Sequence, residues 1–346
     1  MSLRNSNVKI KIPKLLKDKL KNKKINKIYN NFSKSIKIKQ DFIVGVSGGP
    51  DSLALAFFSK IYSLENRLNV KFLIVDHKLR TESTIEAKQV KKTLKKFFIN
   101  CEILTWKGKK PKNNIQSLAR IKRYNLLISK CKKFKIKNIL LAHHQDDLFE
   151  NFFIRILRGS GLKGLTSFDE KTKINDVNIL RPLINQKKDD MLFVSKFVFN
   201  FFVNDPSNND KKFQRIRVRK LISELKKEGL DKRKFANTIK NLKHSEAVIN
   251  FFVSKNIKKN SIFSKKNGFI LNQDFFSQPY EVIFRSLSDL IKLTGKKYYP
   301  VRGRKLDKII DQISQKSFLK LTLGGCIIKK VNQTVIISKE HQNKVT

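Results

Sequence analysis

From residue 40 to about residue 160 the sequence alternates short apolar runs with longer amphipathic stretches, one pair about every thirty residues. The apolar runs, which predict strands, are 42–46, 70–75, 101–105 and 138–142. The amphipathic stretches, which predict helices, are 53–64, 84–98, 115–134 and 148–158. A strand at 178–183 and a helix at 186–202 are expected to follow. Alternation of this kind predicts an α/β fold with a parallel sheet whose carboxyl strand ends share one ligand-binding edge.

The rest of the chain has a different character. A polar, turn-rich segment at 204–212 marks a boundary. Residues 213–260 are basic and helix-like, and 262–300 is predicted to be mostly helical. Three short strands are expected at 317–323, 325–330 and 333–338. The predicted organisation is a basic lead-in, helical or mobile, at 1–40, the α/β domain at 41–205, a basic helical segment at 206–290 and a small α+β module at 291–346.

The charge balance points to a polyanionic partner. The chain has 76 Lys and Arg residues against 28 Asp and Glu residues, a formal net charge of +48. An AT-rich genome would explain abundant Lys, Ile, Asn and Phe, but it would not explain the shortage of acidic residues. The excess therefore favours nucleic acid. An anionic membrane surface and association with ribosomes are the alternatives.

Several protein classes are disfavoured by what the sequence lacks. Its three cysteines, Cys101, Cys131 and Cys326, form no CxxC pair, which argues against a disulfide scaffold and a thiolate metal site. No apolar run is long enough for a membrane span, and the basic N-terminus does not read as a signal peptide. The expectation is a cytoplasmic protein without a membrane partner.

The hexapeptide SGGPDS at 47–52 lies between a predicted strand and a predicted helix. Its two glycines allow a sharp turn that directs backbone N–H groups towards an anion, and the positive end of the helix faces the same place. Asp51 places a negative charge there, which fits a phosphate site if Mg²⁺ lies between the carboxylate and the phosphates. The alternative is a glycine turn with a simple helix cap.

Two further motifs follow predicted strands. VDHKLR places Asp76 and His77 at the end of the second strand, and AHHQDDLFEN places His143, Asp146 and Asp147 after the fourth. Adjacent carboxylates at a ligand-binding edge can bind Mg²⁺ or hold an ammonium group. Each motif also has a purely structural interpretation. VDHKLR would be a strand-ending Asp beside an exposed His, and the aspartates of AHHQDDLFEN would only stabilise a helix N-terminus.

Taken together and in order, these motifs resemble the tRNA(Ile)-lysidine synthase family of PP-loop ATP pyrophosphatases. The resemblance also includes ARIKRY at 119–124, RGSGLKGL at 158–165, ILRPL at 179–183 and DPSNND at 205–210. It covers 40–220 well and the C-terminal module weakly. The sequence departs from the common family pattern at Lys78, Asn151 and Ile216.

The resemblance implies that ATP adenylates the wobble cytidine of a tRNA(Ile) with a CAU anticodon, and that L-lysine then displaces AMP. It implies ATP and Mg²⁺ as cofactors, with Asp51 as the metal ligand. The implied catalytic residues are Asp51, His143, Asp146 and Asp147. The implied ATP-binding residues are Ser47, Gly48, Gly49, Pro50, Asp51, Ser52, Asp76 and His77. The basic residues expected to bind tRNA are Arg215, Arg217, Arg219 and Lys220, with Arg302, Arg304 and Lys305 in reserve. The oligomeric state stays open, with a homodimer included. The rival functions are a tRNA thiolase on the same fold and a non-enzymatic RNA-binding protein with a degenerate loop.

Overall fold

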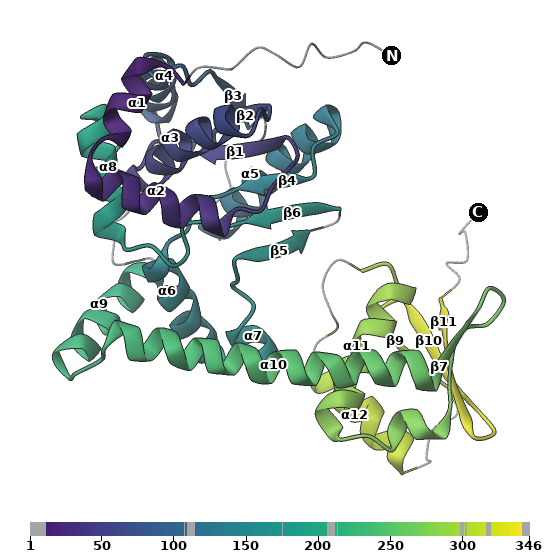
Figure 1. Ribbon diagram of the computed structural model, residues 1–346. Helices are drawn as coiled ribbons and strands as arrows, with labels where there is room; N and C mark the ends of the chain where they lie inside the picture. The colour runs from purple at the N-terminus through teal and green to yellow at the C-terminus, as the bar shows by residue number, and fades with distance from the viewer. Residues whose placement is uncertain are drawn as a thin grey trace. The chain divides into compact units, whose positions relative to one another are not determined.

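The computed structural model describes residues 12–106, 108, 115–174, 176–205, 212, 214–297, 301, 303–315 and 320–340. The chain forms two compact units, Met1–Leu230 and Asp231–Thr346. Both can be followed along the ribbon in Figure 1. The second unit begins before the predicted 291–346 module because helix α10 (Lys232–Asn260) packs on η2 (Gln273–Phe276) and α11 (Tyr280–Thr294) of the same unit. The functions expected for the ranges 1–40, 41–205, 206–290 and 291–346 stay predictions.

A six-stranded sheet forms the centre of the first unit, in the order β3-β2-β1-β4-β6-β5. All neighbouring strands are parallel except β5 and β6. The strands are β1 (Phe42–Val46), β2 (Val70–Asp76), β3 (Cys101–Thr105), β4 (Asn138–Leu140), β5 (Lys171–Ile174) and β6 (Val177–Leu180). The predicted α/β fold and its parallel strands are confirmed. Of the strands of this sheet, only β5 was not predicted, because this half-exposed edge strand has no continuous apolar run.

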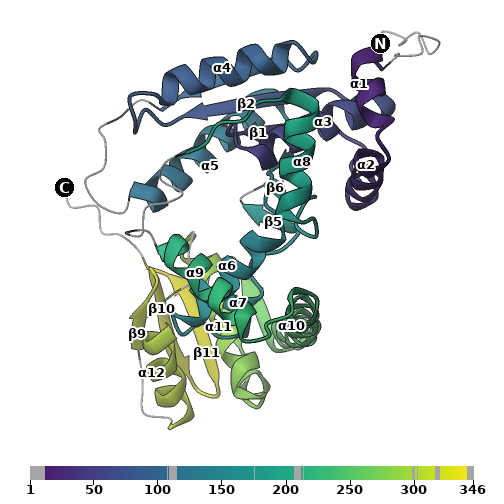
Figure 2. The same cartoon turned by 90° about the vertical axis from the view of Figure 1, so that its left-hand side faces the viewer.

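Helices cover both faces of this sheet (Figure 2). The helices are α1 (Lys14–Leu20), α2 (Lys23–Ser35), α3 (Pro50–Glu65), α4 (Ser83–Lys95), α5 (Ile115–Phe134), α6 (Gln145–Ile156), α7 (Leu162–Leu165), α8 (Lys188–Phe199) and α9 (Gln214–Lys227). One core cluster joins α2, α3, α4 and α8 to the sheet, and a second joins α5 to its other face. Helix α3 is buried almost all round because its sequence LALAFF is apolar on every side.

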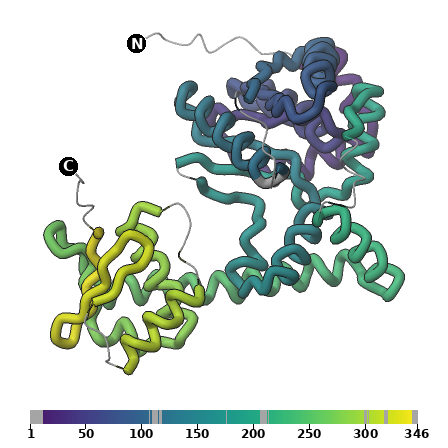
Figure 3. The backbone as a smooth tube through the Cα atoms, turned by 180° about the vertical axis from the view of Figure 1, so that it is seen from behind, coloured from purple at the N-terminus to yellow at the C-terminus, as the bar shows by residue number. Residues whose placement is uncertain are grey.

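The second unit combines helices with a five-stranded antiparallel sheet in the order β7-β8-β11-β10-β9. Its strands are β7 (Ser261–Ser264), β8 (Gly268–Leu271), β9 (Lys320–Leu323), β10 (Cys326–Val331) and β11 (Thr334–Lys339). Its helices are α10 (Lys232–Asn260), η2 (Gln273–Phe276), α11 (Tyr280–Thr294) and α12 (Gly303–Ser314). The last three strands, yellow in Figure 3, match the predicted strands and confirm the small α+β module.

The prediction that 262–300 is mostly helical is wrong for its first part. The β7–β8 hairpin occupies 261–271, and Gly268 has a positive φ of 82° at its turn. Each strand has only four residues, and β8 gains its second partner from β11 at the far end of the chain. Such non-local pairing is invisible in a local sequence pattern. Within the described part of the chain, no helix has the length and apolarity that a membrane crossing requires.

Candidate functional site

The loop at 47–52 joins the end of β1 to the start of α3, as the sequence predicts. The Ser52 hydroxyl holds it closed: its Oγ accepts the backbone N–H groups of Ser47 and Gly48, both at 3.1 Å, and donates to the Gly49 carbonyl at 2.9 Å. Two of the amides expected to face an anion are thus engaged inside the loop. Pro50 begins the helix, a position where its missing N–H costs no hydrogen bond.

Gly48 is fixed by conformation and by space. Its φ is +88°, and an added Cβ would lie 2.6 Å from Cγ2 of Val90 and 2.9 Å from Cγ2 of Val203. The Val203 N–H also donates to the Gly48 carbonyl at 2.9 Å. Any L side chain here would clash as well as strain the backbone. The loop therefore owes its shape to glycine at this position.

The strand order places this loop at the topological switch point, where the chain passes from adding strands on one side of β1 to adding them on the other. Strand β1 lies between β2 and β4, and ligands of open α/β sheets bind at such switch points beyond the carboxyl strand ends. On one side of β1, Asp76 ends β2 and His77 follows it. On the other side, the residues HHQDD at 143–147, here called the 143–147 motif, follow β4. The structure joins loop and motif directly, because Nε2 of His144 lies 3.7 Å from Oδ2 of Asp51.

Asp51 has the properties expected of a carboxylate that binds a cation. Its Oδ1 is buried without a hydrogen-bond partner. Burial, the largest cause, and the charge of Asp147 raise the pKa of Asp51 above its ordinary value. No cluster of three or more acidic, His or Cys side chains able to hold a metal occurs among the described residues. Mg²⁺ fits nevertheless, because it is commonly held by one or two carboxylates together with waters and substrate phosphates.

The two adjacent histidines have different surroundings. His144 caps α6: its side-chain Nδ1 accepts the backbone N–H of Asp146 at 3.2 Å, while the backbone N–H of His144 donates to Asp147 Oδ2 at 3.1 Å. This reciprocal cap turns Nε2 towards Asp51 and leaves it 3.6 Å from Asp147 Oδ2. The sequence analysis selected His143 and missed His144. The signal was present, because a polar residue before a helix and an acid three residues later form a capping box.

His143 instead packs on Phe168. The two rings meet edge to face with centroids 5.1 Å apart, and His143 Nδ1 is buried without a partner. Burial lowers the pKa of His143 well below its usual range, so the imidazole is neutral at pH 7. Its unpartnered Nδ1 can donate or accept one hydrogen bond, depending on the tautomer.

Arg181 supports this region from the end of β6. It is 4 % exposed, and its Nη1 donates to the Asp169 carbonyl at 2.7 Å and to Thr172 Oγ1 at 2.8 Å. Its guanidinium lies over the Phe168 ring, 4.7 Å from the centroid. Arg181, Phe168 and His143 therefore form a contiguous cluster, with Phe168 between the other two. Arg181 belongs to the ILRPL motif, but no role was predicted for it from the sequence.

A charge cluster joins α6 to α9. Glu150 is 2 % exposed, and its Oε1 accepts Nε of Arg219 at 2.6 Å. Nε of Arg215 lies 3.6 Å from Glu150 Oε2, and its Nη2 lies 3.9 Å from Asp147 Oδ1. Burial alone would raise the pKa of Asp147, but the His144 imidazole and the Arg215 guanidinium hold it below its ordinary value. Two arginines predicted to bind RNA thus reach the acids of α6.

The other predicted RNA-binding residues that the structure describes are exposed. Arg217 and Lys220 are exposed on α9, and Nη1 of Arg217 donates to the Lys212 carbonyl at 2.9 Å. Arg304 and Lys305 are exposed at the start of α12, and Arg302 lies outside the described residues. Glu150 was missed, although its i,i+3 spacing from Asp147 on one helix could have indicated it.

Asp76 shapes the turn after β2. Its Oδ1 accepts the Lys78 N–H at 2.9 Å and the Ser83 hydroxyl at 2.8 Å, and its Oδ2 accepts the Thr84 hydroxyl at 2.7 Å. Burial acts to raise the pKa of Asp76, but these hydrogen bonds outweigh it and lower the pKa. The carboxylate is occupied within its own turn, so any contribution to nucleotide binding comes through the shape of that turn.

His77 is a half-buried imidazole beside a cation. Nε of Arg123 lies 3.4 Å from its Nε2, and its Nδ1 is buried without a partner. Burial, followed by the charge of Arg123, lowers the pKa of His77 to about 4. Because the unfolded chain takes up this proton near pH 6.5 and the folded chain does not, the folded state loses stability as pH falls from 6.5 towards 4.

We therefore expect His77→Gln to reduce the acid sensitivity of folding. When the pH falls from 7.5 to 5, wild type should lose about 1–2 kcal/mol more unfolding free energy than the variant loses. Urea unfolding at the two pH values measures this difference. His244→Gln is the matched control, because His244 is exposed on α10. An equal pH response in wild type and His77→Gln would contradict the assignment.

Comparison with known proteins agrees with this geometry. Residues 17–225 match the model of the PP-loop domain family. The tRNA(Ile)-lysidine synthase of Orientia tsutsugamushi is 34% identical over 305 residues, covering 86% of this chain and 69% of that protein. The enzyme of the same name from Wolbachia pipientis wMel is 32% identical over 302 residues, covering 86% and 70%.

A solved structure also has a similar fold. It is a U34-tRNA thiolase, NcsA, from Methanococcus maripaludis, with a TM-score of 0.56 and 17% sequence identity. The match covers 64% of this chain and 79% of the thiolase. At this identity the likeness shows the shared fold alone.

Proposed function

The chain belongs to the tRNA(Ile)-lysidine synthase family of PP-loop ligases, and on this premise we propose that it joins L-lysine to a tRNA(Ile) at the expense of ATP. In the first step the wobble cytidine of a CAU anticodon attacks the α-phosphate of ATP through its base oxygen and pyrophosphate leaves. In the second step the lysine side-chain amine attacks carbon 2 of the base and AMP leaves. The product is lysidine.

One observation carries this proposal: Asp51 of the phosphate loop meets the 143–147 motif at the sheet's switch point, with the buried Oδ1 of Asp51 unpartnered. The loop at 47–52 would bind the departing pyrophosphate. Mg²⁺, held by Asp51, would supply charge neutralisation at the phosphates. Glycine at 48 and the Ser52 hydroxyl keep the loop in shape before substrate arrives.

The acids of α6 would hold the second substrate. Asp147 stays ionised because its pKa is lowered, and a buried carboxylate is a suitable partner for the lysine ammonium group. Asp146, in the first turn of the same helix, would hold either the ammonium or the metal. Neutral His143, whose buried Nδ1 has no partner, would exchange a hydrogen bond with the substrate amine and help to orient it.

The anticodon loop suits this site. Its bases are unpaired, so the wobble base can leave its stack at lower cost than a base in a duplex. The net charge of +48 provides the attraction to tRNA, and exposed Arg217 and Lys220 are proposed phosphate contacts. We also propose that the protein acts in the cytoplasm and that it forms a homodimer.

Mass spectrometry of the anticodon nucleosides tests this function directly. After incubation of tRNA(Ile) with ATP, Mg²⁺ and L-lysine, the wobble nucleoside should gain one lysine with loss of one water, and one AMP and one pyrophosphate should form per product. Exchange of oxygen for sulfur with a sulfur donor would instead identify a thiolase. Absence of pyrophosphate release with all substrates present would contradict any adenylating activity.

A further inference from the structure

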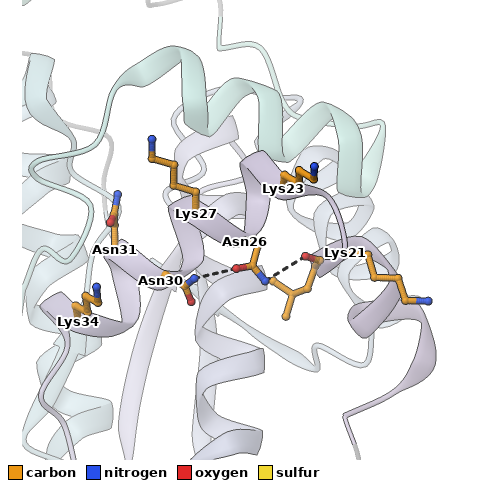
Figure 4. Close-up of a pocket in the computed structure, with 8 residues that line it drawn as sticks. Lys21, Lys23, Asn26, Lys27, Asn30, Asn31 and Lys34 are labelled. Carbon is orange, nitrogen blue, oxygen red and sulfur yellow. Dashed lines mark hydrogen bonds between the residues drawn. The ribbon is translucent and has the colours of Figure 1, made fainter.

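Helix α2 carries a basic face that neither the sheet nor the catalytic loop uses. A shallow hollow of about 460 Å³ lies against it, shown in Figure 4. The hollow is lined by four lysines, three asparagines and one leucine, and by no acid. These residues are Leu20, Lys21, Lys23, Asn26, Lys27, Asn30, Asn31 and Lys34. Apart from Leu20 and Lys21, all lie on the solvent side of α2.

The opposite face of α2 fixes the direction of these side chains. Ile25, Ile28, Tyr29 and Phe32 are buried in the main core of the unit. The Asn22 side chain caps the helix by accepting two backbone N–H groups. The lysines are therefore presented by a rigid, anchored helix rather than by a loose N-terminal arm.

Three lysines of this face remain available for an external anion. Lys23, Lys27 and Lys34 are exposed and have no ion-pair partner in the described part of the chain. Lys21 at the rim pairs with Asp18 at 2.8 Å. From position 23 to 34 the helix rises about 16 Å, so the three cations form a row. Exposed lysine rows are often only solvated, so charge alone does not identify a site.

The asparagines add a second kind of contact. Nδ2 of Asn30 donates to Oδ1 of Asn26 at 2.8 Å, which orders two amides between the lysines. Asn31 is exposed on the same face. An amide can donate to a phosphate oxygen and can exchange hydrogen bonds with a ribose hydroxyl, so cations interleaved with amides suit a ribose-phosphate backbone.

Two contacts tie α2 to the elements that build the catalytic edge. The Ser35 hydroxyl donates to the Pro182 carbonyl at 3.1 Å. Four residues further along that segment, the Gln186 carbonyl accepts the N–H of Gln145, the first residue of α6. Meanwhile Arg215 and Arg219 are directed at acids of α6, so much of the phosphate binding must come from other cations.

We propose that the lysine–asparagine face of α2 is a docking surface for the ribose-phosphate backbone of the tRNA substrate, outside the pocket for the wobble base. This inference rests on the proposed function for the identity of the RNA. In this proposal the surface binds the ribose-phosphate backbone of the tRNA and makes no base-specific contacts.

The test replaces Lys23, Lys27 and Lys34 together by Gln. The matched control is the triple Gln variant of Lys88, Lys92 and Lys95, three exposed lysines on α4 of the same unit. Loss of three phosphate contacts should reduce the slope of log K against log salt by about 2–3 and raise the Kd for tRNA on the order of tenfold. The control should change both much less. ATP binding should be unchanged in both.

A variant with Arg at the same three α2 positions keeps the positive charge, so it should bind tRNA with the wild-type Kd and salt slope. That result would show that the Gln variant acts through lost charge and not through a change in folding. An unchanged slope in the α2 Gln variant, or an equal loss in the α4 control, would overturn the proposal. Lysidine formation by the wild type is measured separately. If wild type binds tRNA through α2 but forms no lysidine, the proposed function fails while the docking surface stands.

Discussion

Asp51→Asn should reduce pyrophosphate release with tRNA, ATP and lysine by at least about 100- to 1000-fold, the cost of removing one group that stabilises transition-state charge. The substitution keeps the side chain's shape but removes the charge at the buried, unpartnered Oδ1. Mg²⁺ would then lose its proposed protein ligand beside the phosphates. Binding of tRNA should remain within about twofold, because phosphate contacts elsewhere supply that affinity.

Asp176→Asn serves as the control for this prediction. Asp176 belongs to the same unit, but its side chain is 98 % exposed between β5 and β6. It should turn over like wild type. A Mg²⁺ titration adds a second readout, since Asp51→Asn should require more Mg²⁺ for ATP to bind. Near-normal turnover of Asp51→Asn at ordinary Mg²⁺ would refute the metal-ligand assignment.

The α/β fold was predictable because its signals are local. Each parallel strand is a short apolar run, and each longer helix has its own amphipathic or fully apolar pattern, so β1 to β4, α3 to α6 and α8 follow from neighbouring residues. The four-residue helix α7 was not predicted, because it is too short to show a helical period. The β7–β8 hairpin was not predictable in this way. Its four-residue strands depend on β11, more than sixty residues away, and such short segments carry little periodicity.

The candidate site was predictable in position but not in the direction of its side chains. Topology alone brings 47–52, Asp76 and the 143–147 motif to one sheet edge. Whether His143 or His144 faces Asp51 depends on the capping geometry of α6. That Arg219 reaches Glu150 depends on how α6 packs against α9. A sequence shows a basic run but does not show which of its members find acids in the fold.

The Glu150–Arg219 pair yields the second large expected effect. Arg219→Met should lower the free energy of unfolding of the first unit by about 1–3 kcal/mol. That is less than the 3–5 kcal/mol of a fully buried pair, because the Arg219 side chain is 36% exposed and Arg215 still lies near Glu150. Urea unfolding followed by circular dichroism measures the loss. Lys220→Met, at the exposed neighbouring position, should change stability by less than about 0.5 kcal/mol.

A second substitution shows whether the lost stability comes from an uncompensated carboxylate. Combining Arg219→Met with Glu150→Gln should recover part of the lost unfolding free energy. In wild type the Arg219 guanidinium donates to the Glu150 carboxylate at 2.6 Å, whereas the neutral amide of Gln does not need a cation beside it. The sequence pattern alone predicts something different, namely that Arg219 is a phosphate contact. If Arg219→Met leaves unfolding unchanged while weakening tRNA binding and flattening its salt dependence, Arg219 serves the RNA and not the fold. Loss of stability with an intact salt slope instead assigns Arg219 to α6, where it holds Glu150 in place beneath Asp147.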